Sequence, residues 1–229
     1  RRPAPLSCGV EELESNEEGD GQNENGEGCG DDDDEAAGVE IWHTLDRDPV
    51  PQQRVREQQL RRVNYLSAWN VESAGFVQLG DELTELTTMV DGGRHVIGRD
   101  ETPYDENGMF RQQFSDLYSI DVETGAKSKI TDRMFGGGSP SPDGRYIVWF
   151  SGKDWYAHDL ERGQTSNITE GVGTEFLNLD VTPTREQMPS FGLAGWMEDG
   201  RSVLLNDQWD VWRVSLDGSG GEALTSGAS

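Results

Sequence analysis

The side chains that could perform acid–base or nucleophilic chemistry are scattered along this sequence. Its three histidines, His43, His95 and His158, lie in strand-like stretches and show no His-x-x-x-His spacing. Cys8 and Cys29 are the only cysteines, and their separation is not that of zinc ligands. No serine stands in a Gly-x-Ser-x-Gly motif, in which a hydrolase presents its nucleophile on a sharp turn. We therefore predict no catalytic residue, no metal site and no cofactor site in this chain.

One polar segment has the residue types expected of a binding loop. Residues 171–192 interrupt a repeated strand pattern and include Asp180, Arg185 and Glu186. Long loops lie at the surface of a rigid scaffold, where charged side chains can reach a ligand. We predict that these three side chains contact substrate, and the alternative is an ordinary surface loop.

Composition excludes several classes of partner. The 44 acidic residues outnumber the 19 basic ones, which gives a formal charge of −25. Such a charge repels nucleic-acid phosphate and anionic membrane surfaces. No apolar run reaches the roughly 18 residues that indicate a membrane span. We predict neither a nucleic-acid partner nor a membrane span.

The first 38 residues differ from the rest of the chain. Residues 11–35 carry 13 acidic side chains and no lysine or arginine. A segment this polar cannot bury enough apolar surface to offset its conformational entropy. We predict a disordered acidic leader over residues 1–38.

The elements that must position any site come from an internal repeat. Three times an Asp-Gly turn and an arginine precede an apolar strand, at Asp91, Asp143 and Asp199. Asp-Gly is a strong hairpin signal because glycine adopts positive φ without steric cost. A second strand follows each turn and begins with aspartate, and a third element ends in an aliphatic–threonine pair. The strand aspartate and the aliphatic residue of the closing pair are Asp116 and Ile130, Asp154 and Ile168, and Asp210 and Leu224. The aliphatic residue lies 14 positions after the aspartate each time.

Regular repeats of short antiparallel strands are typical of β-propeller blades. We predict an all-β fold, a partial β-propeller of about three and a half four-stranded blades over residues 39–229. The blades are expected at 39–84 (partial), 85–132, 133–170 and 171–226. Tyr118, Trp155 and Trp212 occupy matching places, and we expect their rings to pack between blades. Residues 49–62 are polar, and we predict a solvated connection there, with a short exposed helix as the alternative.

Three and a half blades are fewer than the four or more of closed propellers. An open array would leave sheet faces and edges exposed. We therefore expect the ring to be completed by further chain or by a homo-oligomer.

Several stretches carry a resemblance to a known family. Residues 141–145 (SPDGR), 154–156 (DWY) and 167–169 (NIT) resemble the blade repeat of Tol-type periplasmic propellers and of prolyl oligopeptidase-type serine peptidases. Residues 39–43 (VEIWH), 149–156 (WFSGKDWY) and 192–214 favour the peptidases. The resemblance covers roughly residues 39–226 and is closest to bacterial peptidases of the dipeptidyl-peptidase or acylaminoacyl-peptidase kind.

This resemblance implies a function for the segment. In that family a propeller sits over an α/β-hydrolase domain with a Ser-Asp-His triad and restricts entry to short peptides. The triad is not in this chain, so the resemblance implies a gate for peptide substrate and no catalytic residue. The alternative is a non-enzymatic Tol-type propeller that acts as a protein-binding scaffold. We expect a periplasmic or secreted protein.

Overall fold

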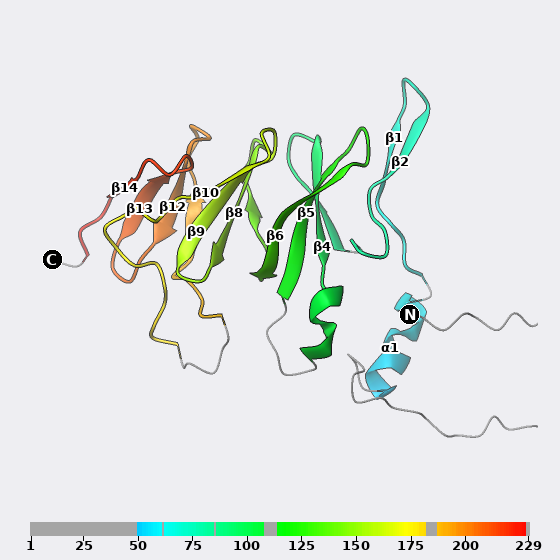
Figure 1. Cartoon of the computed structure of the whole chain (residues 1–229), viewed down its shortest axis with the longest axis horizontal. Helices are drawn as coiled ribbons and strands as arrows, with labels where there is room; N and C mark the ends of the chain where they lie inside the picture. The colour runs from blue at the N-terminus through cyan, green and yellow to red at the C-terminus, as the bar shows by residue number, and fades with distance from the viewer. Residues whose placement is uncertain (1–49, 61, 85, 108–113, 182–186, 228–229) are drawn as a thin grey trace, which may run out of the picture. The chain divides into compact units, whose positions relative to one another are not determined.

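The computed structural model describes residues 50–60, 62–84, 86–107, 114–181 and 187–227. The predicted acidic leader and the strand-like residues 39–43 lie outside the described residues. The remainder is almost entirely antiparallel β-structure (Figure 1). A hairpin is formed by β1 (Ser67–Asn70) and β2 (Gly75–Gln78). Three four-stranded sheets follow it in the chain, and each contains consecutive strands in sequence order.

We call these sheets blades 1 to 3. Blade 1 consists of β3 (Leu86–Met89), β4 (His95–Asp100), β5 (Phe114–Asp121) and β6 (Lys127–Phe135). Blade 2 consists of β7 (Ser139–Pro140), β8 (Tyr146–Ser151), β9 (Asp154–Asp159) and β10 (Gln164–Asn167). Blade 3 consists of β11 (Leu193–Trp196), β12 (Ser202–Asn206), β13 (Val211–Ser215) and β14 (Gly221–Ala223). Successive up-and-down sheets of four strands are the blades of a β-propeller, so the predicted fold class is confirmed.

The predicted Asp-Gly turns join the first and second strands of each blade. Gly92, Gly144 and Gly200 have φ values of 86°, 71° and 62°, where an L side chain is strained. The turns also touch one another. A Cβ on Gly144 would overlap the carbonyl oxygen of Asp91 in the turn of blade 1. Glycine is therefore required at this position for the close approach of two blades as well as for the turn.

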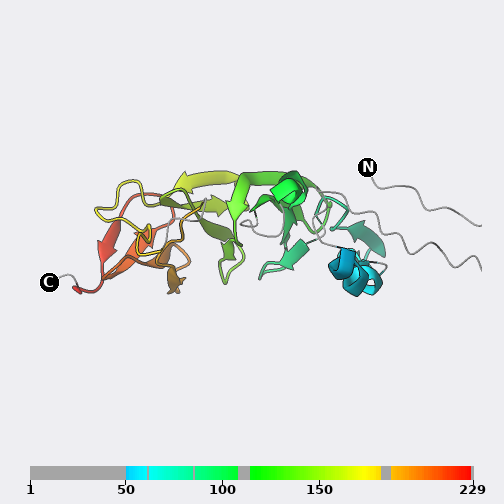
Figure 2. The same ribbon diagram turned by 90° about the horizontal axis from the view of Figure 1, so that it is seen from below.

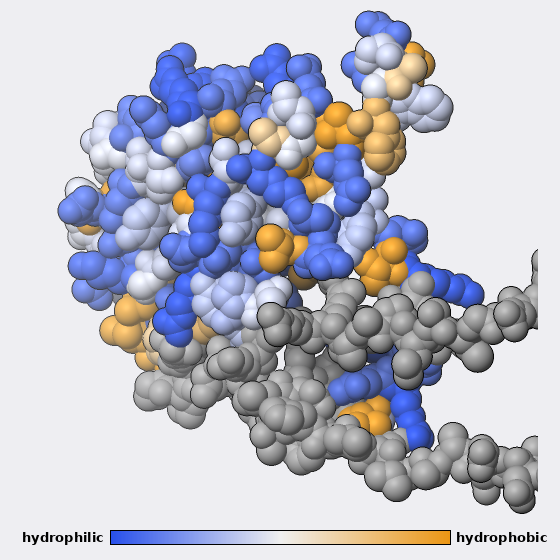
Figure 3. Space-filling model, turned by 45° about the vertical axis from the view of Figure 1, so that its right-hand side comes forward, coloured by the Kyte–Doolittle hydropathy of each residue, from blue (hydrophilic) through white to orange (hydrophobic). Residues whose placement is uncertain are grey.

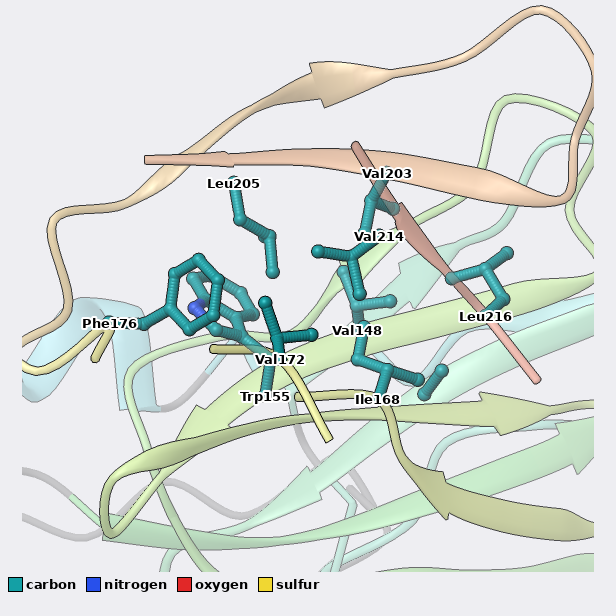
Figure 4. Packing of buried hydrophobic residues seen from close by; sticks show 10 residues of the cluster. Val148, Trp155, Ile168, Val172, Phe176, Val203, Leu205, Val214 and Leu216 are labelled. Atoms are coloured by element: carbon teal, nitrogen blue, oxygen red, sulfur yellow. The ribbon is translucent and has the colours of Figure 1, made fainter. Parts of the chain in front are cut away.

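Apolar clusters lie between neighbouring sheets. Figure 4 shows the largest, in which Val148, Trp155 and Ile168 of blade 2 face Val203 and Val214 of blade 3. A second cluster joins blades 1 and 2 through residues such as Leu117 and Trp149, and a third joins the β1–β2 hairpin to blade 1. Trp155 packs between blades as predicted, and Trp212 lies against the same cluster. Tyr118 belongs to none of these clusters, and its ring instead faces the Lys129 ammonium group at 5.8 Å.

The prediction of a solvated connection at residues 49–62 was wrong. Val50–Leu60 forms the helix α1, and its described side chains are mostly exposed. Glutamine, arginine, glutamate and leucine all have good helix propensity, and Pro51 stands in the first turn, where proline is tolerated. The helix lacks an apolar face, which is why hydrophobic periodicity did not reveal it. Within the described residues no helix is long and apolar enough to cross a membrane.

Candidate functional site

The long connections of the blades share one end of the sheets. In an up-and-down sheet, the connection from the second to the third strand lies at the same end as the link to the next blade. The β4–β5 connection with its 3-10 helix (Thr102–Asn107) and the insertion between β10 and β11 are therefore at one end (Figure 1). Figure 2, seen from below, shows the 3-10 helix in green and the insertion in yellow. The short Asp-Gly turns lie at the opposite end. We call the end with the long connections the insertion face.

The insertion between β10 and β11 is held at its base by apolar packing. Phe176 and Val172 are buried in the cluster between blades 2 and 3 (Figure 4). An isolated bridge pairs Leu177 with Ser190, and the N–H of Asn178 donates to the carbonyl of Pro189 at 2.9 Å. The stem of the insertion is thus fixed to the blades.

A groove of about 220 Å³ lies beside this stem. It is lined by the insertion residues Thr174, Glu175, Leu177, Leu179, Asp180 and Phe191, and by the β12–β13 loop residues Asp207, Gln208 and Trp209. The side chains of Leu179 and Trp209 are largely exposed and provide apolar surface at its opening. Asp180 was predicted to contact substrate, and the structure places it in this groove. Arg185 and Glu186 lie outside the described residues.

Asp207 organises the β12–β13 loop. Its carboxylate accepts hydrogen bonds from the Thr174 hydroxyl (2.7 Å), the Trp212 indole N–H (2.8 Å) and the backbone N–H of Trp209 (2.8 Å). Burial disfavours the charged form of Asp207, but these hydrogen bonds outweigh it and lower the pKa of the carboxyl. Asp207 therefore stays ionised and ties the insertion to the loop that carries Trp209.

The groove combines negative charge with apolar surface. Its carboxyl groups belong to Glu175, Asp180 and Asp207, and its described lining includes no basic, histidine, cysteine or serine side chain. A negative groove with apolar walls favours a ligand that combines a positive charge with apolar surface, such as a peptide with a free amino group. The sequence did not indicate Trp209 as part of a site, because only the fold brings the β12–β13 loop beside the insertion.

A second hollow, of about 330 Å³, lies at the opposite end among the Asp-Gly turns. Both of its arginines form ion pairs. Arg94 contacts Glu161 at 3.1 Å, and Arg145, which also lines the hollow, contacts Asp159 at 3.0 Å. Since these ion pairs satisfy its arginines, the groove on the insertion face is the better candidate.

The repeated strand aspartates have structural roles. In blade 2 the Thr169 hydroxyl donates to Asp154 at 3.1 Å, and in blade 3 the Thr225 hydroxyl donates to Asp210 at 2.7 Å. Each threonine also accepts from a strand N–H, that of Trp155 or Val211. In these two blades the tie joins the strand aspartate to the threonine of the closing pair.

Blade 1 departs from the pattern at Asp116. Its carboxylate accepts from the Tyr104 hydroxyl (2.5 Å) and the backbone N–H of Arg133 (3.1 Å), and it forms an ion pair with Lys129 (2.7 Å). Arg133 has a φ of 48° at an irregularity in the β5–β6 pairing. Burial, together with the bond to the Asp116 carboxylate, raises the pKa of Tyr104 to about 12. Asp116 thus ties the segment between β4 and β5 to a bulge in β6.

The described histidines lie apart from the groove. His158 is buried and shares a hydrogen bond of 2.8 Å with Thr165, and His95 lies 3.4 Å from the Ser119 hydroxyl. His43 is outside the described residues. Among the residues that the structure describes, no three His, Cys, Asp or Glu side chains gather in a way that could hold a metal ion.

Comparison with known proteins gives structural matches only. No protein-family model matches the sequence, and no curated protein does. A putative TolB from Agrobacterium tumefaciens is 18% identical, with a TM-score of 0.39 over 72% of this chain and 56% of that one. The β-propeller domain of the Trilobed protease from Pyrococcus furiosus is 15% identical, with a TM-score of 0.39 over 72% of this chain and 50% of that one. TolB from Acinetobacter baumannii is 14% identical, with a TM-score of 0.37 over 71% of this chain and 37% of that one. The chain thus spans about half the length of these proteins or less, and its own sheets establish the blade architecture.

Proposed function

We propose that this chain is the propeller segment of a prolyl oligopeptidase-like serine peptidase. In this role the segment gates peptide access to a catalytic α/β-hydrolase domain elsewhere in the protein. The resemblance of residues 39–226 to the blades of such peptidases supports the proposal. The observation that carries it is the groove on the insertion face, where long connections gather and carboxylates lie beside exposed apolar side chains.

The groove would act on peptides before cleavage. A peptide amino group or a basic side chain would be attracted by Glu175 and Asp180, and an adjacent apolar side chain would lie against Leu179 or Trp209. Such contacts are made with the substrate as it enters and not with the reacting bond. They therefore contribute to binding and leave the chemical step unchanged.

The test is kinetic and uses the whole gene product, which contains residues 1–229. Trp209→Ala and Asp180→Asn should each raise KM for short amino-terminated peptides by about three- to tenfold, with kcat unchanged. Glu198→Gln is the matched control, because Glu198 is an exposed acid in the Asp-Gly turn region of blade 3. If the KM values of Trp209→Ala and Asp180→Asn equal that of the control Glu198→Gln, the result would contradict a role for the groove in peptide binding. A gene product that cleaves no peptide but binds a protein partner would instead favour the Tol-type scaffold.

A further inference from the structure

Arg99 differs from the other partly buried arginines of the blades. Among the described residues three arginines are partly buried, and two of them form ion pairs. Arg145 contacts Asp159 at 3.0 Å, and Arg213 contacts Asp199 at 2.8 Å. The side chain of Arg99 makes no ion pair or hydrogen bond with any residue that the structure describes. Removing a cation from water without a counter-charge costs free energy, so the fold alone does not account for this side chain.

Arg99 faces the interface between blades 1 and 2. It pairs with Leu117 on β5, and cross-strand partners share one face of a sheet. Leu117 is fully buried in the apolar cluster that joins blades 1 and 2. Arg99 is the last residue but one of β4, directly before the β4–β5 connection (Figure 1). Its side chain therefore belongs to the part of this interface nearest the insertion face.

Blade 2 has an aromatic residue at the equivalent position. Arg99 lies five positions after Arg94 of its Asp-Gly turn, and Phe150 lies five positions after Arg145. Phe150 packs against the apolar cluster between blades 2 and 3, and its ring lies 5.6 Å from that of its cross-strand partner Trp155. Blade 1 thus has a charged side chain where the repeat supplies apolar packing. A position that departs from the repeat at a cost in stability is a candidate for function.

The link between blades 1 and 2 brings main chain to Arg99. Residues 136–138, between β6 and β7, are all glycine. A Cβ on Gly137 would lie 3.8 Å from a guanidinium nitrogen of Arg99, so this nitrogen lies beside the main chain of the link. At the interface between blades 2 and 3, by contrast, the insertion places Phe176 in the apolar cluster (Figure 4). The glycine link therefore covers the guanidinium with no side chain of its own.

We propose that Arg99 binds the carboxylate of a peptide ligand at the insertion face. This inference rests on the proposed function, which makes the ligand a peptide. A guanidinium group offers two parallel N–H donors that match the two oxygens of a carboxylate. Hydrophilic residues cover most of the surface in Figure 3, and in the whole chain acidic residues outnumber basic ones by 44 to 19. A lone positive group on such a surface gives a carboxylate a distinct place to bind.

The net charge favours a peptide over a ligand with several phosphates. A formal charge of −25 repels a ligand that carries several negative charges. A short peptide with free ends carries one positive and one negative group, so it is not repelled as a whole. Its amino group would be attracted by Glu175 and Asp180 in the groove, and its carboxylate would be bound by Arg99.

Peptide binding by the whole gene product tests this assignment. The probes are the pentapeptide Ala-Ala-Pro-Ala-Ala with a free C-terminal carboxylate and the same peptide with a C-terminal amide. The protein is first treated with a fluorophosphonate, which blocks activated serines, so that the probes are not cleaved. Calorimetry then gives each dissociation constant. The wild type should bind the free acid about tenfold more tightly than the amide, and Arg99→Gln should bind the two equally.

Arg201→Gln is the matched control. Arg201 is an exposed arginine in the Asp-Gly turn of blade 3, at the end opposite the insertion face. This variant should keep the tenfold preference for the free acid. Equal affinities of the wild type for the two probes, or an undiminished preference in Arg99→Gln, would overturn the proposal.

A third probe identifies the source of the carboxylate. It is the peptide Ala-Ala-Glu-Ala-Ala with a C-terminal amide, whose single carboxylate is on a side chain. If this probe binds as tightly as the free acid and loses that affinity in Arg99→Gln, Arg99 binds an acidic side chain. If it binds as weakly as the first amide, Arg99 binds the C-terminal carboxylate.

Thermal denaturation gives an independent test. Arg99→Met keeps a long side chain and removes the charge. Because Arg99 has no counter-charge in the described structure, the ligand-free variant should keep its melting temperature or gain up to about 3 °C. A fall of several degrees would show that Arg99 has a structural partner in the protein, and it would overturn the proposal.

These readouts do not depend on hydrolysis. An active peptidase whose preference for the free acid survives in Arg99→Gln would overturn the role of Arg99 alone. An inactive protein that shows the preference and loses it in Arg99→Gln would overturn the peptidase function and support the carboxylate site.

Discussion

At the scale of single residues, a hydrogen bond between a threonine and a strand aspartate recurs in blades 2 and 3. Thr169 is buried, and its hydroxyl satisfies both Asp154 and the N–H of Trp155. Thr169→Val keeps the shape and leaves both partners unpaired, so the free energy of unfolding should fall by about 1–3 kcal/mol. Thr225→Val removes the same bonds at an exposed site and should cost less than about 1 kcal/mol. Urea denaturation of both variants gives the comparison, and equal losses would contradict the assigned role of burial.

His158 makes stability depend on pH. Burial, with a smaller contribution from the charge of nearby His95, lowers the pKa of His158, although Asp159 acts in the opposite direction. As the pH falls, His158 is therefore protonated at a higher pH in the unfolded chain than in the folded one. The free energy of unfolding decreases on acidification below the unfolded pKa of about 6.5. Between about pH 7.5 and 5.5, the wild type should lose more unfolding free energy than His158→Asn. The same pH slope in both proteins would show that another group is responsible.

At the scale of elements, the contact between Asp-Gly turns joins blades 1 and 2. Gly144→Ala places a Cβ onto the carbonyl of Asp91, so the turns must separate. We expect a loss of about 3 kcal/mol or more in unfolding free energy. Gly163→Ala has a similar φ of 65° with open space around it, and strain alone should cost about 1 kcal/mol. Thermal denaturation of the two variants checks this, and equal melting temperatures would argue against the turn contact.

The elements also show how far the sequence predicts this fold. The Asp-Gly turns and the 14-residue interval from strand aspartate to closing aliphatic residue are visible in the sequence, so the three blades could be derived from Asp143, Asp154 and Ile168 and their counterparts. The helix α1 could not, because it has no apolar face to give a periodic pattern. The bulge at Arg133 was also hidden, since it depends on Asp116 meeting Tyr104 across a long connection.

The candidate site was predictable only in part. Asp180 was singled out because it stands in an insertion, and the groove does contain it. Trp209 was not, because it follows an ordinary strand and its role depends on which loop the fold places beside it. A sequence indicates where loops are long, but loop neighbours at one end of a sheet are set by the packing of blades.

At the scale of the whole molecule, the three blades carry the groove on the insertion face, which the proposed function assigns to peptide binding. Packing between successive sheets makes the module rigid enough to hold the insertion and the β12–β13 loop in a fixed relation. Under the proposed function, the catalytic residues lie in another part of the same protein.

The most direct measurement is of hydrolysis by the product of the whole gene. The purified protein is treated with a fluorophosphonate, which labels activated serines, and is assayed on a short chromogenic peptide and on a folded protein. We predict covalent labelling, cleavage of the peptide and no cleavage of the folded protein. A gene product that is neither labelled nor active on the peptide would contradict the peptidase account.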